Sequence, residues 1–352
     1  MLLEKRIEAF KTLGDFLSQF NIQKIERKEN IPFNDPFFDV FKDQIKKAKE
    51  FNGWFTDDNI LFALENWSVL LSTENLTSWT NNYNLSKNDL KTIAVIMAGN
   101  IPMVGFHDFL SVLISGNNII VKQSSGDKHF MQLIAKYLEH IEPEFKGKIN
   151  FKEGELGKFD AVIATGSNNT ARYFDYYFGK HPNIIRQNRN AVAVLTGNET
   201  EEELKNLGED IFRYFGLGCR SVAKVFVPKG YDFDQIFKNI YPYKSLINYK
   251  KYENNYTYNK AVYLMSKFQL LENGFFMLKE DSSYSSPIAT LFYEYYDEID
   301  NIKAKLDLEE DQIQCIVSNS GIENEVSFGE TQKPKLEDYA DGVDTLRFLE
   351  NL

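Results

Sequence analysis

Cysteine is scarce in this sequence, with only Cys219 and Cys315 in 352 residues. Two cysteines cannot build a disulfide framework in a chain of this size, and nothing indicates an oxidising compartment. Histidine is also rare, and the four are His107, His129, His140 and His181. None of them has Cys, Asp or Glu companions at metal-ligand spacing. The sequence therefore predicts neither a disulfide scaffold nor a metal site.

Long hydrophobic runs and an excess of positive charge are also missing. No stretch approaches the ~20 apolar residues that a membrane helix requires. The N-terminal MLLEKRIEAFKTLGDFL mixes charges into its apolar positions and lacks the cleavage site of a signal peptide, so a cytoplasmic location is expected. Forty Lys and Arg against 51 Asp and Glu give a net charge of -11, which argues against a nucleic-acid partner.

The sequence does contain the alternating pattern of an α/β protein. Residues 36–71 show helical spacing of apolar residues and predict a helical lead-in. From Lys91 on, the apolar runs TIAVIMAGN, NIIVKQSS, KINFKEG and FDAVIATGS predict strands, and the segments between them predict helices. IPMVGFHDFLSVLISGN is expected to form a helix with a proline near its first turn, and NIIRQNRNAVAVLTG one strand. This alternation predicts an open parallel sheet with helices on its faces.

A second α/β series begins after Gly197. EEELKNLGEDIFRYFG predicts a helix with an acidic start, SVAKVFVPKG a strand and DFDQIFKNIYPY a helix. Further strands are expected around FFMLKE, PIATLFYEYY and IQCIVS. The tail from Phe328 has no strong period, and we expect it to pack across another domain or subunit.

Polar residues and glycines gather just past the predicted strand ends, where an open α/β sheet binds its ligand. These positions are Asn100, Lys122 to Ser125, Thr165 to Ser167, and Gly216 to Cys219. None of the segments is a G-x-G-x-x-G or a G-x-x-x-x-G-K-[ST]. A dinucleotide, if bound, must therefore be bound by other means.

In their order and spacing, AGNIP, SGNNIIVKQSS, ATGS and a glycine-flanked Cys before a strand resemble the aldehyde dehydrogenase superfamily. Three longer stretches look like the LuxC-type acyl-CoA reductases, relatives of the bacterial bioluminescence fatty-acid reductase. They are GNIPMVGFHDFLSVLISGN, IIRQNRNAVAVLTGNETEEELKNLGEDIFRYFGLGCRSVAKVFVP and KPKLEDYADGVDT. The resemblance runs from about Lys91 to the end of the sequence, and it implies the two-domain fold of that superfamily.

The resemblance implies roles for two residues. Cys219 matches the nucleophile that attacks the carbonyl carbon, expels coenzyme A and holds the acyl group as a thioester. Asn100 matches the asparagine whose amide, with the backbone N–H of the cysteine, forms the oxyanion hole. On composition alone, Cys219 would more often be a buried core thiol, and Asn100 a cap of a helix beginning at Ile101. Cys315, in an apolar run, keeps the core interpretation.

The resemblance also implies a nicotinamide cofactor, NADPH or NADH. Lys122 matches the lysine that reaches the adenosine ribose, with Ser124 or Ser125 near a 2′-phosphate. Thr165, Gly166 and Ser167 match the turn before the helix whose N-terminus faces the pyrophosphate. Without the family resemblance, Lys122 would be interpreted as a solvated lysine at a strand end, and ATGSNN as an ordinary Ser or Asn helix cap.

Two departures from the superfamily stand out. The glutamate that activates water in aldehyde oxidisers has its place taken by Arg186-Gln187-Asn188-Arg189, which favours a reductase. The glutamate that holds the nicotinamide ribose falls near Ser283, where no carboxylate stands, although Glu280 or Asp281 is nearby. The hairpin arm that the family uses for subunit exchange is hard to recognise within residues 73–90.

Together these features predict three parts: a helical lead-in plus dinucleotide-binding domain (1–188), a catalytic domain (189–325) and a C-terminal segment packing back (326–352). The resemblance implies, as the function, reduction of a long-chain acyl-CoA or acyl thioester to the aldehyde by NADPH or NADH, in a homo-oligomer. An acyl-protein synthetase-like partner is also expected from the family. The alternatives are an acyl-thioester transferase and a non-catalytic, partner-binding scaffold. His107 reads as a core histidine, and His181 is the better candidate for a proton donor.

Overall fold

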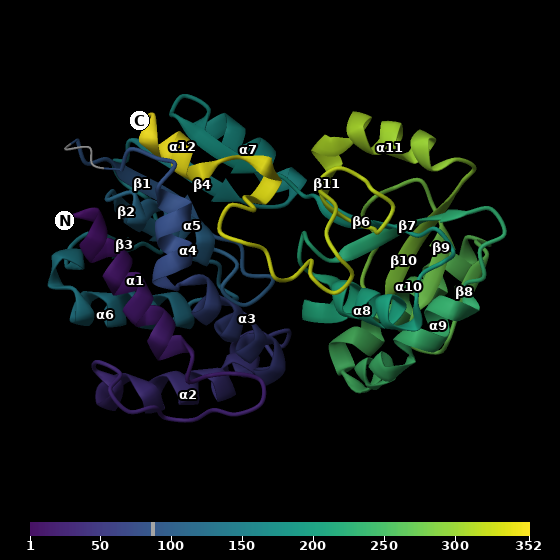
Figure 1. Cartoon of the computed structure of the whole chain (residues 1–352), viewed down its shortest axis with the longest axis horizontal. Coiled ribbons are helices and arrows are strands. Elements are labelled where there is room, and N and C mark those ends of the chain that lie inside the picture. The colour runs from purple at the N-terminus through teal and green to yellow at the C-terminus, as the bar shows by residue number, and fades with distance from the viewer. Residues whose placement is uncertain (86–88) are drawn as a thin grey trace. The chain divides into compact units, whose positions relative to one another are not determined.

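The computed structural model describes residues 1–85 and 89–352, which divide into two compact units. The first unit comprises Met1–Gln187 and Lys335–Leu352, and the second comprises Asn188–Pro334 (Figure 1). Elements of the first unit are α1 (Leu3–Leu17), α2 (Asn34–Phe51), α3 (Asp57–Leu70), α4 (Thr73–Thr80), β1 (Thr92–Ile96), α5 (Phe106–Ile114), β2 (Asn118–Lys122), α6 (His129–Ile141), β3 (Ile149–Phe151), β4 (Ala161–Thr165), α7 (Asn168–Phe178), β5 (Asn183–Arg186) and α12 (Thr345–Glu350). Elements of the second unit are β6 (Asn190–Val194), α8 (Glu201–Phe212), the 3₁₀ turn η2 (Arg213–Gly216), β7 (Val222–Pro228), α9 (Asp234–Ile240), α10 (Lys250–Met265), β8 (Leu270–Glu272), β9 (Met277–Glu280), β10 (Thr290–Tyr296), α11 (Ile299–Leu308) and β11 (Ile313–Val317).

The first unit is built on a five-stranded sheet in the order β3-β2-β1-β4-β5, with every neighbouring pair parallel. The chain adds β2 and β3 on one side of β1, then crosses back to add β4 and β5 on the other side. The strand order thus reverses between β1 and β4. In open α/β sheets, this reversal creates a crevice at the carboxyl ends of the strands, where ligands bind.

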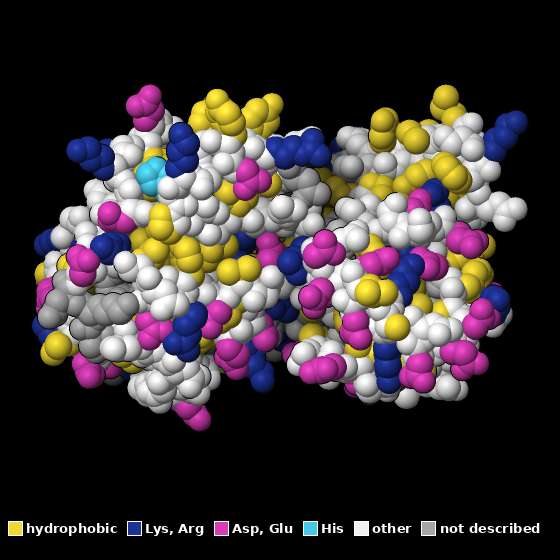
Figure 2. Space-filling view, turned by 90° about the horizontal axis from the view of Figure 1, so that it is seen from above, with side chains coloured by type: hydrophobic (Ala, Val, Ile, Leu, Met, Phe, Trp, Pro, Cys, Tyr) yellow, Lys and Arg dark blue, Asp and Glu magenta, His cyan; other side chains and the backbone are white. Residues whose placement is uncertain are grey.

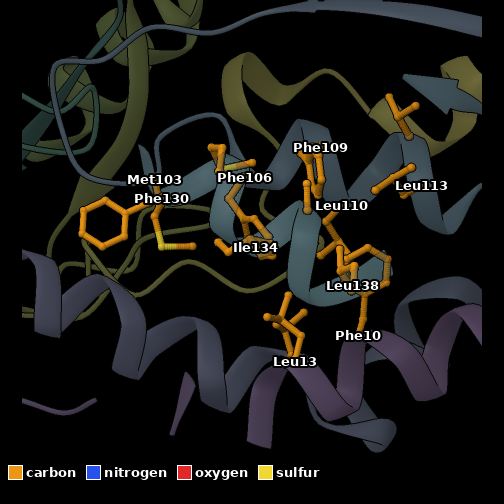
Figure 3. Close-up of a cluster of buried hydrophobic side chains, with 14 of the residues drawn as sticks. Phe10, Leu13, Met103, Phe106, Phe109, Leu110, Leu113, Phe130, Ile134 and Leu138 are labelled. Carbon is orange, nitrogen blue, oxygen red and sulfur yellow. The ribbon is translucent and has the colours of Figure 1, made fainter. Parts of the chain in front are cut away.

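Helix α5 packs at the centre of the first unit's core. Its sequence FHDFLSVLI is apolar on nearly all sides, and eight of its nine residues are buried. A helix of this kind must be covered all round. The buried side chains of α5 meet those of α1 and α6, with Phe10, Leu13, Phe106, Phe109 and Ile134 among them (Figure 3). The sheet and α5 therefore form one continuous core with the helical lead-in.

The last residues of the chain belong to the first unit. Arg186, at the end of β5, is 4% exposed and forms an ion pair with the buried Asp108 of α5. The same guanidinium donates to the Ala340 carbonyl at 2.6 Å and to the Thr345 hydroxyl at 3.1 Å. A buried arginine with these acceptors fixes the segment that leads into α12, shown in yellow in Figure 1.

The second unit contains a six-stranded sheet in the order β11-β6-β7-β10-β9-β8. All pairs are parallel except β8 with β9, an antiparallel pairing that the sequence did not predict. Alternation along β7 sends Val225 and Val227 to the face that α8 and α9 cover, and Phe226 to the face that α11 covers. Thr200 and Glu203 form a capping box at the start of α8, in agreement with the predicted acidic start.

Two sequence expectations were wrong in detail, and one helix was missed. The helix expected from Ile101 begins at Phe106, because residues 101–105 form turns around Met103, whose φ is 57°. The strand expected over 183–197 is two strands, β5 and β6, which belong to different sheets. Helix α10 was not anticipated, since KKYENNYTYNKAVYLM buries only Tyr252, Tyr256 and Asn259 and has no clear apolar stripe.

Within residues 73–90, where the hairpin arm was sought, 73–80 form α4, and 86–88 lie outside the described residues. No helix in the described parts of the chain is long and apolar enough to cross a membrane. Acidic and basic side chains are interspersed over the face shown in Figure 2, and that face carries no continuous basic surface.

Candidate functional site

The candidate residues of the first unit lie at one edge of its sheet. Asn100 follows β1, Lys122 to Ser125 end and follow β2, and Thr165 to Ser167 end and follow β4. β1 pairs in parallel with both β2 and β4, so these carboxyl ends lie side by side. The structure therefore brings the predicted residues together at the point where the strand order reverses.

The loop after β1 and the loop after β2 approach each other closely at Gly99 and Ser124. A Cβ on Gly99 would lie 2.6 Å from both Cβ and Oγ of Ser124, so only glycine fits at this approach. The Asn52 side chain donates to the Gly99 carbonyl at 3.1 Å and fastens the same loop from the helical lead-in. Asn100, the next residue, is exposed beside this fixed backbone.

Asp127 holds the other side of the Asn100 loop, and sequence reasoning missed it. Its carboxylate accepts the Met103 backbone N–H at 3.0 Å, which secures the left-handed Met103. The side chain is buried, and burial raises the pKa of Asp127 to about 7, against the lowering effect of the Met103 hydrogen bond. In the sequence the only signal was an aspartate closing VKQSSGD, which looks like an ordinary surface acid.

Helix α7 begins directly after the turn that ends β4. Ser167 caps the helix by accepting from the Thr170 backbone N–H at 3.3 Å, so the capping interpretation of this residue is confirmed. The first turn of α7 contains no acidic residue. Because helix N-termini attract anions, this end of α7 suits a phosphate group.

Cys219 belongs to the second unit and lies in a tight turn before β7. The Ser221 backbone N–H donates to the Gly218 carbonyl at 3.0 Å, which places Cys219 as the second residue of a four-residue turn. Cys219 is exposed and forms no disulfide. The alternative of a buried core thiol is therefore wrong for Cys219.

The chain reaches this turn through an unusual backbone. Tyr214, Phe215 and Gly216 all adopt left-handed conformations, with φ of 55°, 59° and 75°. Each non-glycine residue in this conformation costs about 1 to 2 kcal/mol. Stacking of Phe215 on Tyr249, with ring centroids 4.8 Å apart, helps to hold the kink between α8 and the Cys219 turn. Strain held in place next to a candidate nucleophile is typical of functional sites.

Other residues singled out in the sequence have structural roles. His107 meets the Leu336 carbonyl at 2.9 Å and packs against Trp79 and Tyr339, as expected of a core histidine. Cys315 is half-buried in β11. His181 is exposed beside Phe159. Within residues 1–85 and 89–352, no group of three or more His, Cys, Asp or Glu side chains is placed to hold a metal ion.

Arg186 and Arg189, from the segment expected at the position of the water-activating glutamate, also make structural contacts. Arg186 is bound to Asp108 and the C-terminal segment, and Arg189 donates to the Glu310 carbonyl at 3.0 Å. Near Ser283, Asp281 pairs with Lys279 and accepts the Ser283 N–H at 2.9 Å. These contacts keep Arg186, Arg189 and Asp281 bound to groups of their own units.

The chain has a parallel sheet whose strand order reverses between β1 and β4, and a second α/β unit that carries Cys219. This is the aldehyde dehydrogenase fold, and solved aldehyde dehydrogenase structures are similar to this chain. Aldehyde dehydrogenase 21 from Physcomitrella patens, solved with the product succinate, gives a TM-score of 0.67 at 10% identity over 100% of this chain and 84% of that one. Lactaldehyde dehydrogenase from Escherichia coli gives a TM-score of 0.61 at 12% identity, over 90% of this chain and 74% of that one. The NAD+ complex of an aldehyde dehydrogenase from Bacillus cereus gives a TM-score of 0.57 at 13% identity, over 90% of this chain and 72% of that one.

The sequence also matches the family described as acyl-CoA reductase (LuxC) over residues 42–236, more than half of the chain. The chain belongs to this family. No curated protein matches the sequence. Family and fold together support an oxidoreductase whose chemistry forms aldehydes.

Proposed function

We propose that the protein reduces an acyl-CoA, or a related acyl thioester with a long chain, to the aldehyde through a thioester on Cys219. The observation that carries the proposal is the exposed thiol, held in a tight turn of a chain that belongs to the acyl-CoA reductase family. NADPH is the first expected reductant and NADH the alternative. In this proposal the first unit binds the dinucleotide and the second carries the nucleophile.

In the first step, the Cys219 thiolate attacks the thioester carbonyl carbon. The resulting oxyanion collapses, the bond from carbon to the coenzyme A sulfur breaks, and coenzyme A leaves as a thiolate. The acyl group stays on Cys219 as a new thioester, whose carbonyl keeps its electrophilic character. Exposure of the thiol supports this role, because a nucleophile must be reachable by its substrate.

The oxyanion needs hydrogen-bond donors at the carbonyl. We assign this role to the Asn100 side-chain amide together with the Cys219 backbone N–H. Support comes from the fastening of the Asn100 loop on both sides, through Gly99 and Met103. A donor that is fixed before the reaction stabilises the transition state without reorganisation.

The residues at the sheet edge fit a dinucleotide. The close approach at Gly99, the reversal between β1 and β4, and the N-terminus of α7 together form the kind of cradle that phosphates use. Lys122, Ser124 and Ser125 would hold the adenosine ribose and a 2′-phosphate, and Thr165, Gly166 and Ser167 the pyrophosphate. A bound nicotinamide supplies a hydride.

In the second step, the carbonyl carbon of the thioester accepts the hydride. The carbon–sulfur bond to Cys219 then breaks, the aldehyde is released and the thiolate is regenerated. Water must not intercept the thioester before the hydride arrives. The absence of a carboxylate at positions 186–189, and the structural use of Arg186 and Arg189, support a long-lived acyl-enzyme.

The test is intact-mass analysis after incubation with a long-chain acyl-CoA such as myristoyl-CoA. We expect one acyl adduct on the wild type and on Cys315→Ser, and none on Cys219→Ala. NADPH or NADH should then remove the adduct and release the aldehyde. An adduct that also forms on Cys219→Ala would refute the proposal.

The same experiment separates the two alternatives. A transferase would form the adduct and keep it in the presence of either nicotinamide cofactor. A non-catalytic scaffold would form no adduct, and neither acyl-CoA nor NADPH would raise its melting temperature, since a ligand that binds the folded state stabilises it.

A further inference from the structure

A short segment far along the chain lies against the turn that carries Cys219. Residues 328–334, here called the strap, belong to the second unit and follow the bridge between Val317 and Val326. The Gln332 side-chain amide donates to the Ser221 hydroxyl at 3.4 Å, and both residues are buried. Ser221 closes the Cys219 turn through its own backbone N–H. The strap thus contacts the turn at its closing residue.

A buried carboxylate fixes the strap. Asp210 of α8 is 0% exposed and accepts three hydrogen bonds from it. They come from the backbone N–H of Gly329 at 2.7 Å, the backbone N–H of Thr331 at 3.0 Å and the Thr331 hydroxyl at 2.8 Å. Gly329 has a φ of 88°, a conformation that favours glycine, and a Cβ there would lie only 3.0 Å from the Cβ of Asn206 in α8.

The cost of burying Asp210 argues that these contacts hold the strap firmly. Burial raises the pKa of Asp210 to about 6, although all three hydrogen bonds from the strap act to lower it. An acid at this depth retains its charge at neutral pH only because the N–H and O–H groups of the strap replace water. Asp210 and the strap are therefore mutually dependent.

We propose that Gln332 is a positioning residue for Cys219, and that Asp210 sets Gln332 in place through Gly329 and Thr331. The side-chain amide of Gln332 restrains Ser221 and with it the turn from Gly218, so the thiol is presented in one orientation. The significance of this orientation for catalysis rests on the proposed function, whereas the restraint itself does not.

The first readout is hydrogen exchange of peptides that cover residues 217–223, because the Ser221 N–H is protected by the turn. We expect exchange to be at least about tenfold faster in Gln332→Leu and in Ser221→Ala than in the wild type, a change that corresponds to about 1.4 kcal/mol. The double variant should be no faster than either single one, since both remove the same contact. Gln332→Glu, which can accept from the Ser221 hydroxyl, should restore protection.

Glu330→Gln is the matched control, because Glu330 lies on the same strap but its carboxylate is half exposed and pairs with Lys333. It should leave exchange unchanged. Asp210→Asn keeps the shape but loses acceptor capacity, and should accelerate exchange in both the strap and the turn. If this variant does not fold, the two single variants of the Gln332 contact still decide.

The second readout is the single-turnover rate of acyl transfer from acyl-CoA to Cys219. A positioning role predicts a loss of about tenfold or more in Gln332→Leu, with the apparent affinity for acyl-CoA within about twofold of the wild type. Unchanged exchange in Gln332→Leu would overturn the inference. Faster exchange in Gln332→Leu with an unchanged acylation rate would mean that the strap has a structural role alone. That result would also overturn the inference. If the wild type forms no adduct but exchange responds, the proposed function fails while the restraint stands.

Discussion

Asp127→Asn tests whether a buried carboxylate is ionised beneath the Asn100 loop. The pKa of Asp127 is raised from 3.8 to about 7 by burial. At ~1.4 kcal/mol per unit, a shift of about 3 units means that the ionised side chain destabilises the folded state by about 4 kcal/mol at pH 8. Because the pKa is raised on folding, the stability contributed by this group is present below about pH 4 and is lost as the pH rises through about 7.

Asparagine keeps the acceptor for the Met103 N–H and removes the charge. Its amide N–H₂ group replaces the O–H of the protonated acid, so at low pH the variant and the wild type should be similar in stability. Between pH 4.5 and pH 8, however, the wild type should lose about 3 kcal/mol that the variant does not lose. The variant should therefore be the more stable protein at pH 8.

Urea unfolding followed by tryptophan fluorescence measures this difference in the right unit. All three tryptophans, Trp54, Trp67 and Trp79, belong to the first unit, together with Asp127. The control is Glu153→Gln, because the Glu153 side chain is 89% exposed and its pair with Lys128 should contribute less than about 1 kcal/mol. Equal pH dependence of unfolding in Asp127→Asn and the wild type would refute the assignment of a buried, ionised carboxylate.

Three further substitutions probe the rest of the structure. Asn100→Ala should lower kcat by about 10² to 10³ with little change in KM, which steady-state kinetics would show, and an unchanged kcat would exclude an oxyanion role. Gly216→Ala should destabilise the second unit by about 1 to 2 kcal/mol in thermal unfolding, because the residue has a φ of 75°; a stability equal to the wild type would show that the kink relaxes. Arg186→Met leaves Asp108 buried without its cation and should cost about 3 to 5 kcal/mol and release the C-terminal segment to limited proteolysis, whereas continued resistance would contradict its role as an anchor.

The regular parts of the fold could be predicted from the sequence because their patterns are local. The strand β1, helix α6 and strand β7 follow from apolar runs bounded by glycine and polar residues, and α8 from its acidic start. The start of α5 could not be predicted in this way. Its position depends on Met103, whose left-handed conformation is secured by a carboxylate 24 residues further along the chain.

The same limit applies to the candidate site. The order of motifs predicted that Asn100, Lys122 and the turn at Thr165 lie close together, because residues at the carboxyl ends of neighbouring parallel strands share one edge of the sheet. Nothing local distinguishes Asp127 and Asp210 from surface acids, because their burial arises from packing between distant segments. Helix α10 was missed for the opposite reason: a mostly polar sequence is held helical by a few buried contacts.

The return of residues 335–352 to the first unit has a consequence for synthesis on the ribosome. The second unit is translated between the two pieces of the first, so residues 1–187 emerge without Leu336, Tyr339, Leu346 and Leu349, which complete their core. At about 5 to 20 residues per second, the ribosome needs roughly 10 to 30 s to translate residues 188–352, which comprise the second unit and the missing piece. Until residues 335–352 are made, the first unit presents an open apolar surface, whereas the second unit is complete as soon as Pro334 has been added. The protein is thus expected to mature in reverse order, its first-made unit being the last to close.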